Sequence, residues 1–261
     1  MLQKRYDLSD EGAANEVIDS RAFLQFCGVD SSNQVPDGDT IGCFRNILVR
    51  NHLEERLFNQ VVEKLAACGL LLRKGTIVDF LLISAPSSTH NQEKKRDPEA
   101  HSVKKGNQWH FGYKEHVGVD ADTGLIHTLE TTAANVHDSN MTSALIKGTE
   151  AVVYGDSGYL GSERKQDTRT INTQGQPICC KINLRPSQMK HLTAEELEAF
   201  KSEEHEKSSI RSKIEHVFAV AKRLSKNHRT RYRGFEKVHQ QSCMIFALAN
   251  LFLARNRLLF A

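Results

Sequence analysis

One run of residues, GTIVDFLLI at positions 75–83, constrains the fold of this chain more than any other segment. It is short and rich in β-branched and large apolar side chains, which is typical of a buried β-strand. A single acid, Asp79, interrupts it. An ionised carboxylate is costly to bury unless it is paired or binds a metal, so Asp79 is a candidate functional residue. The alternative is that this strand has one exposed face.

The rest of the chain divides into a helical part and a part rich in strands. Before residue 72, apolar residues recur at steps of three and four, and polar pairs such as Ser-Asp supply helix caps. Beyond it, short apolar runs alternate with turns. We therefore predict a helical N-terminal region over 1–72 and an α/β domain over 73–261, with a polar insertion around 184–207 and a C-terminal helix. The predicted strands are 75–83, 109–120, 125–132, 151–156 and 177–183, and the predicted helices are one within 135–150, 193–201, 208–226 and 243–254.

The composition is that of a folded protein without a membrane span. Of the 261 residues, 39% are hydrophobic and 26% are charged, close to the average for globular domains. The longest apolar window, 243–254, falls short of the roughly 18 residues that a membrane helix needs. The N-terminus lacks a secretory signal, and the six cysteines lack the spacing of a zinc site. We expect reduced thiols and a cytoplasmic protein.

Two further acids follow Asp79 along the chain. Asp156 ends the predicted strand AVVYGD, and Glu215 lies on the predicted helix 208–226. At 100° per residue, Glu215 shares one helix face with Arg211 and Lys222, within about 40°. Taken singly, Asp156 is explained by a turn or a helix cap, and Glu215 by an ion pair with Arg211 one turn away. Three acids in this order, two on strands and one on a late helix, instead suggest a metal site, because hard cations such as Mg²⁺ prefer carboxylate oxygens.

Two segments are strongly basic, 90–106 and 222–237. In the second, aromatic residues interleave with Arg229, Arg231 and Arg233, a composition suited to phosphate contact and base stacking. We therefore predict that the second segment contacts DNA. For the first segment, DNA contact and a solvated surface remain equal alternatives.

These residues resemble a known family, the DDE transposases of bacterial insertion sequences. The chain is most similar to the fifth-numbered insertion-sequence family, within the broader fourth-numbered group. The resemblance implies an RNase H-like α/β fold with a mixed five-stranded sheet flanked by helices, preceded by a small helical region. It covers nearly the whole chain, in the motifs VPDGDTIGCFRN, GTIVDFLLISAPSSTHN, KKGNQWHFGYKEHVGVDADTGLIHTLETTAANVHD, YGDSGY, RSKIEHVFAVAK and RYRG.

The resemblance also implies a mechanism and its residues. By position, the catalytic and metal-binding triad is Asp79, Asp156 and Glu215, which would hold two Mg²⁺ ions, with Mn²⁺ able to substitute. Arg211 and Lys222 match the basic positions of the family's late-helix signature and would contact phosphates. The implied partners are the element's terminal inverted repeats, the target DNA and a second copy of the chain, in the bacterial cytoplasm at the nucleoid.

The chain departs from the family pattern at three places. Ser208 stands where the late-helix signature has Tyr, and Phe80 follows the first acid where relatives have a small residue or Thr. The chain also begins almost at YDLSDEG, so we expect an N-terminal truncation. Asp120, at the tip of the predicted hairpin, is a rival for the first acid. A nuclease without strand transfer and an inactive DNA-binding remnant are the alternative functions.

Overall fold

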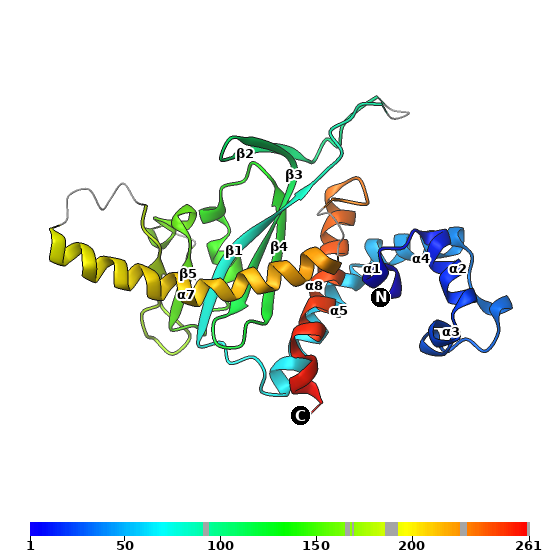
Figure 1. Ribbon diagram of the computed structural model, residues 1–261, viewed down its shortest axis with the longest axis horizontal. Coiled ribbons are helices and arrows are strands. Elements are labelled where there is room, and N and C mark those ends of the chain that lie inside the picture. The colour runs from blue at the N-terminus through cyan, green and yellow to red at the C-terminus, as the bar shows by residue number, and fades with distance from the viewer. Residues whose placement is uncertain (91–93, 165–167, 169, 186–192, 225–228, 260–261) are drawn as a thin grey trace.

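Side-chain caps start three of the five α-helices of the N-terminal region. The structure is a computed structural model that describes residues 1–90, 94–164, 168, 170–185, 193–224 and 229–259 (Figure 1). Ser9, Ser20 and Asp37 each accept a hydrogen bond from the backbone N–H three residues beyond them, which satisfies a donor that the first helical turn leaves unpaired. The helices are α1 (Leu2–Tyr6), α2 (Asp10–Asp19), α3 (Arg21–Cys27), α4 (Gly38–Arg50) and α5 (Leu53–Ala67).

A mixed sheet forms the centre of the rest of the chain. Its order is β2-β3-β1-β5-β6, and β4 pairs with β3 beside β2. The hairpin β3–β4 and the pair β1–β3 are antiparallel, whereas β1–β5 and β5–β6 are parallel. The five predicted strands are confirmed in identity and order. The strands are β1 (Gly75–Ser84), β2 (His101–Lys105), β3 (Gln108–Asp120), β4 (Ile126–Ala133), β5 (Val152–Gly155) and β6 (Cys179–Ile182).

Strand β2 is an addition to the predicted sheet. It comes from the first basic segment and pairs with the first residues of β3, from Gln108 to Gly112. No apolar run marks this strand in the sequence, because Val103 is its one hydrophobic residue and both of its faces are largely exposed.

Helices cover both faces of the sheet. The long helix α7 (Ala194–Leu224) crosses one face, and α8 (Phe235–Leu258) lies beside α5 at its edge (Figure 1). The main core joins Ile77 and Leu81 of β1 to α7, α8 and α5. A second cluster on the opposite face includes Val78 of β1 and Leu145 of the short helix α6 (Thr142–Leu145). Burial of this apolar surface, at about 25 cal/mol per Å², fixes α7 against the sheet.

Two helix predictions need correction. Residues 193–201 and 208–226 were predicted as separate helices, but α7 is continuous from Ala194 to Leu224. No Gly or Pro separates the two segments, and Lys207 pairs with Glu203 and Glu204 at helical spacing, so the helix continues through the polar stretch. The predicted helix within 135–150 is reduced to one 3₁₀ turn and α6. Residues 186–192 of the predicted insertion lie outside the described residues.

No helix in the described part of the chain combines the length and the apolar character needed to cross a bilayer.

Candidate active site

Two of the predicted acids meet across the centre of the sheet. Strands β1 and β5 are parallel neighbours, with Ile77 opposite Tyr154. Asp79 and Asp156 each lie two residues further along, so the same register places them side by side, with Asp79 in the middle of β1 and Asp156 directly after the end of β5. Side chains alternate between the faces of a strand. Because Ile77 and Tyr154 belong to the core cluster that includes α7, both aspartates face α7 as well.

Burial and charge raise the proton affinity of Asp79. The residue is 8% exposed, and the pKa of its carboxyl rises to about 6, mainly because burial disfavours the ionised form. The negative charge of Asp156 raises the pKa further. The N–H of Phe80, 2.8 Å from Oδ1, and the guanidinium of Arg211 act in the opposite direction. The two aspartates therefore form an electronegative pair that a positive charge would stabilise.

A positively charged side chain, that of Arg211, contacts Asp79 of this pair. From α7, its Nη2 lies 3.5 Å from Oδ2 of Asp79, and its Nη1 donates to Oδ1 of Asn183 at 2.8 Å. Asn183 follows β6 and donates in turn to Glu204 at 2.8 Å. These bonds hold the guanidinium beside the aspartates. The sequence predicted Arg211 as a phosphate contact or a partner of Glu215, and its contact with Asp79 was missed.

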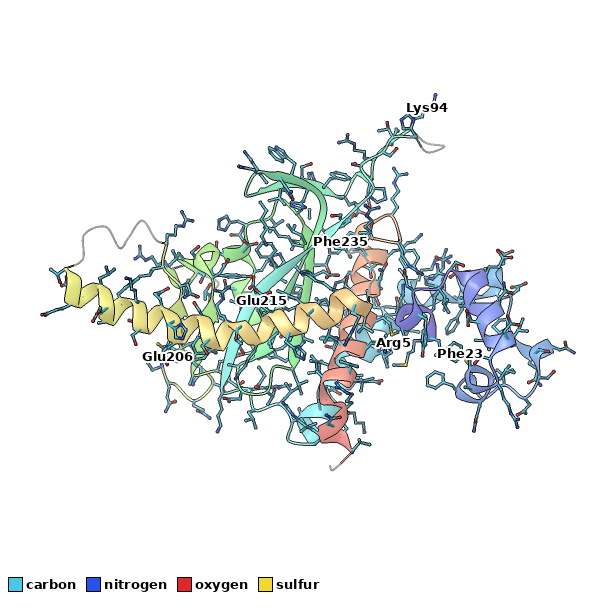
Figure 2. The ribbon with its side chains drawn as sticks, viewed as in Figure 1. Arg5, Phe23, Lys94, Glu206, Glu215 and Phe235 are labelled. Atoms are coloured by element: carbon cyan, nitrogen blue, oxygen red, sulfur yellow. The ribbon has the colours of Figure 1, made fainter. Side chains whose placement is uncertain are left out.

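Glu215 stands apart from the aspartate pair. It lies one turn beyond Arg211 on the same shoulder of α7 and is exposed (Figure 2). Within the described residues, no group of three or more His, Cys, Asp or Glu side chains is close enough to hold a metal. Lys222, two turns further, is also exposed, and Ser208 contacts Asn183 at 3.3 Å. The structure thus brings Asp79 and Asp156 together and leaves Glu215 on the adjoining helix surface.

A further carboxylate near the site was not predicted as functional. Asp138 Oδ1 accepts a hydrogen bond from Lys114 at 2.7 Å, and its other oxygen lies close to Gly158. A Cβ at Gly158 would lie 3.2 Å from Asp138 and 3.0 Å from Asp156, so the missing side chain lets two carboxylates approach one backbone. The pKa of the buried Tyr159 hydroxyl is raised well above its usual range, first by burial and then by Asp79, Asp138 and Asp156. The sequence contains Asp138 in an NVHD motif, for which no functional role was predicted.

Asp120, the alternative candidate for the first acid, is held by hydrogen bonds from the backbone. Its carboxylate accepts backbone hydrogen bonds from Leu72, Arg73 and Thr123 at 2.6–2.9 Å. Burial opposes ionisation, but these bonds outweigh it and hold the pKa of Asp120 below its usual value. Asp120 pairs with Thr76, three residues before Asp79 on β1. This geometry supports Asp79 rather than Asp120 as the partner of Asp156.

The basic segment after α7 contacts the N-terminal helices. Arg231 forms an ion pair with Asp7, and the ring of Tyr232 lies between the cations of Lys4 and Arg45, 4.5 and 4.9 Å from its centroid. Other residues of this basic segment contact the residues between β1 and β2, or the end of β1. Arg233 donates to the carbonyl of Arg96 at 2.8 Å, and Arg229 forms a backbone bridge with Ser84. DNA contact by Arg229, Arg231 and Arg233 stays a prediction.

A mixed sheet of this order, with two aspartates paired at its central parallel strands under a long helix, defines an RNase H-like α/β protein. Comparison with known families narrows this class. Residues 71–251 match the family model described as Transposase DDE domain, and residues 1–46 match the model described as Transposase domain (DUF772). The first match covers more than half of the chain, so the chain belongs to the DDE transposase family, enzymes that act on DNA and generally use divalent metal ions. No solved structure matches the chain.

Proposed function

We propose that this chain is the transposase of a bacterial insertion sequence of the fifth-numbered family, and that it cuts and joins DNA strands by a DDE mechanism. The observation that carries the proposal is the meeting of Asp79 and Asp156 across β1 and β5, inside the segment that matches the transposase domain. An RNase H-like sheet that gathers acids on two neighbouring internal strands is suited to phosphodiester chemistry.

The aspartate pair fits a divalent cation. Two neighbouring carboxylates, one of them buried with a raised pKa, repel each other unless a positive charge lies between or beside them. We propose Asp79 and Asp156, joined by Glu215 from the adjoining surface of α7 when the ions bind, as the ligands of two Mg²⁺ ions, which Mn²⁺ can replace. Bound there, the ions would supply an activated oxygen nucleophile and neutralise charge on the scissile phosphate.

The protein's own residues would hold and orient the DNA. Arg211 fixes the position of Asp79 through its bonds to that carboxylate and to Asn183. Lys222 is exposed on α7 and free of packing constraints from the core, so it suits contact with a phosphate. The proposed substrates are the terminal inverted repeats of the element and the target DNA, and two copies of the chain would act together on the two ends.

A strand-transfer assay with a short donor duplex, target DNA and Mg²⁺ or Mn²⁺ tests this proposal. We expect Asp79→Asn, Asp156→Asn and Glu215→Gln to abolish cutting and joining while DNA binding persists. Glu206→Gln is the matched control for Glu215, because Glu206 is also exposed on α7 and has only a 3.7 Å surface pair with Lys181 (Figure 2). It should retain activity.

Other results would select a different function. Cutting without joining would identify a nuclease, and DNA binding without either reaction in the unaltered protein would identify an inactive DNA-binding protein. Activity in Asp79→Asn together with its loss in Asp120→Asn would overturn the assignment of the first acid.

A further inference from the structure

A cavity of about 580 Å³ lies at the C-terminal end of β1. Its walls are the end of β1, the hairpin β2–β3, and the segment between β1 and β2. We call this segment, described over residues 85–90 and 94–100, the arm. The side chains that matter for the chemistry of the cavity are Arg96, Arg229, Trp109, His110, Ser87 and Ser88. We call the cavity the Trp109 pocket. Neither Asp79 nor Asp156 lines it.

The indole of Trp109 is the most unusual feature of the pocket. It is 70% exposed, although tryptophan is normally largely buried. Trp109 lies opposite Lys104 in the β2–β3 pair, so a cation flanks the aromatic surface. An exposed aromatic ring in a basic groove is the arrangement that stacks bases of unpaired nucleic acid.

The charge of the pocket suits a phosphate. Arg96 and Arg229 reach it from two different segments, and none of the described residues that line it is an acid. Local contacts hold the side chain of Arg96 and the backbone next to Arg229. The guanidinium of Arg96 lies over the ring of Phe111, 5.6 Å from its centroid, and the backbone after Arg229 is fixed by the bond from Thr230 N–H to the carbonyl of Ser84 at 2.9 Å. A guanidinium that is already held in place, as that of Arg96 is, binds phosphate with little loss of side-chain entropy.

A glycine holds the hairpin against the end of β1. Gly112 pairs with Ser84 on one side and with His101 on the other. Its φ of +156° and the space around it exclude a side chain, because a Cβ would lie 2.1 Å from the carbonyl oxygen of Ile83. The close approach places Trp109, three residues earlier on β3, beside the start of the arm. The pocket is therefore a built feature of the fold.

Strand β1 runs from the active site to the pocket. Ser84 follows Asp79 by five residues of β1, which is about 17 Å at 3.3 Å per residue. Along one strand of duplex DNA this corresponds to about five nucleotides at 3.4 Å each, and to fewer in an extended single strand. A strand whose scissile phosphate lay at Asp79 would reach the pocket within a few nucleotides.

We propose that the Trp109 pocket binds one unpaired nucleotide of the DNA strand that enters the active site. The base stacks on Trp109, and the adjoining phosphate lies between Arg96 and Arg229. The nucleotide is unpaired because a base inside a duplex has both faces covered by its neighbours and offers none to the indole. The identity of this strand rests on the proposed function, whereas the capacity of the pocket to bind single-stranded DNA does not.

Tryptophan fluorescence reports directly on the proposed contact, since Trp109 is the only tryptophan in the chain. We expect a short single-stranded thymidine oligonucleotide to quench this fluorescence to saturation without any metal. A blunt duplex of the same length should quench it far less. An oligonucleotide that binds, as judged by its own fluorescence anisotropy, but leaves the emission of Trp109 unchanged would overturn the proposal. So would the absence of binding.

Variants test which groups carry the affinity. Trp109→Ala should weaken binding of the single strand about 5- to 100-fold, whereas Trp109→Phe should retain most of the affinity because it keeps a stacking face. Arg96→Ala and Arg229→Ala should each weaken binding and reduce its salt dependence. Lys94→Ala is the matched control, since Lys94 lies at the tip of the same arm and does not line the pocket (Figure 2). Equal affinity in Trp109→Ala and the unaltered protein would refute the stacking contact.

Failure of this inference can be told apart from failure of the proposed function. Asp79→Asn should show the full quenching of Trp109 while it cuts no DNA. Quenching in an unaltered protein that neither cuts nor joins DNA would support the pocket and contradict the proposed function. Cutting and joining by a protein whose Trp109 fluorescence is never quenched would contradict the pocket and support the proposed function.

Discussion

At the scale of single residues, Asp79 shows how a site can be both costly and specific. Its burial disfavours the charge that a metal ligand needs, and Asp156 adds repulsion. Arg211 offsets part of this cost, and it does so through a fork that reaches Asp79 and Asn183 at the same time. A planar guanidinium can make both bonds, whereas an ammonium group on a flexible stem cannot span them in the same way.

The first residue-scale prediction concerns this fork. We expect Arg211→Lys to lower the rate of strand cutting by about 10-fold or more, because Asp79 loses its positioning partner, while DNA affinity changes little. Initial rates at saturating DNA, with binding measured separately, provide the test. Arg223→Lys is the control, since Arg223 is an exposed arginine of α7 that lies over the ring of Phe252. Equal rates in the two variants would contradict a positioning role for Arg211.

A second residue-scale prediction concerns Glu115, which is buried under α8. Burial raises the pKa of this carboxyl from 4.5 to about 7, although a hydrogen bond from Ser242 opposes the shift. Between these two values the folded protein keeps a proton that the unfolded chain has released. The free energy of unfolding therefore falls as pH rises through this interval.

Glu115→Gln removes this titration because its side chain stays neutral. Relative to the unaltered protein, the variant should gain about 2 kcal/mol in the free energy of unfolding between about pH 5 and about pH 8. Urea denaturation at the two pH values measures the difference. Glu63→Gln, a change at an exposed position of α5, should show no such gain, and a gain of equal size there would rule out burial of Glu115 as the cause.

At the scale of elements, the segment between α7 and α8 joins the two parts of the chain. Tyr232 receives a hydrogen bond from Lys4 at 3.0 Å, and two cations lie over its ring. We expect Tyr232→Ala to reduce the free energy of unfolding by about 2 kcal/mol, and Tyr232→Phe by about 1 kcal/mol, since the latter loses only the hydroxyl. Chemical denaturation gives both values. Identical losses in the two variants would mean that the ring contacts contribute nothing.

A further element-scale prediction concerns the amide of Asn250 on α8, which closes the edge strand β4. It accepts from the N–H of Ile126 at 2.9 Å and donates to the carbonyl of the same residue at 2.8 Å, and it is fully buried. Asn250→Leu would leave both backbone groups unpaired, so we expect a loss of about 3 kcal/mol in the free energy of unfolding. Asn250→Asp, which retains one acceptor, would place a charge there and should be no better. Thermal unfolding that is unchanged in Asn250→Leu would contradict this role.

The sequence predicted those elements whose own residues contain the signal. Apolar runs located β1, β3, β4, β5 and β6, and the strand order brought Asp79 beside Asp156. Strand β2 was missed because its polar residues are held by pairing with β3 rather than by burial. The contact between Arg211 and Asp79 was also missed, since it joins residues 132 positions apart and a local partner, Glu215, was available on the same helix. The exposed Trp109 gave no signal, because a sequence does not show which aromatic side chains remain outside the core.

At the scale of the whole molecule, the position of charge matters more than its sum. Lysine and arginine exceed aspartate and glutamate by only three, so the net charge alone gives weak attraction to DNA. The basic groups that we propose to contact DNA lie instead on the C-terminal half of α7 and around the end of β1. The opposite end of α7 is rich in glutamate, and it points away from the N-terminal helices (Figure 1). Local neutralisation of phosphates, rather than long-range attraction, should therefore determine affinity.

This distribution gives a prediction about salt. For each phosphate contact that is lost, the slope of the logarithm of affinity against the logarithm of salt concentration should become shallower by about 1. We expect this change in Lys222→Ala but not in Lys201→Ala, although both lysines are exposed on α7, because they lie about 30 Å apart along the helix. Titrations of a cognate duplex at several salt concentrations measure both slopes. A shallower slope in Lys201→Ala would extend the DNA along the whole of α7, and an unchanged slope in Lys222→Ala would remove this lysine from the interface.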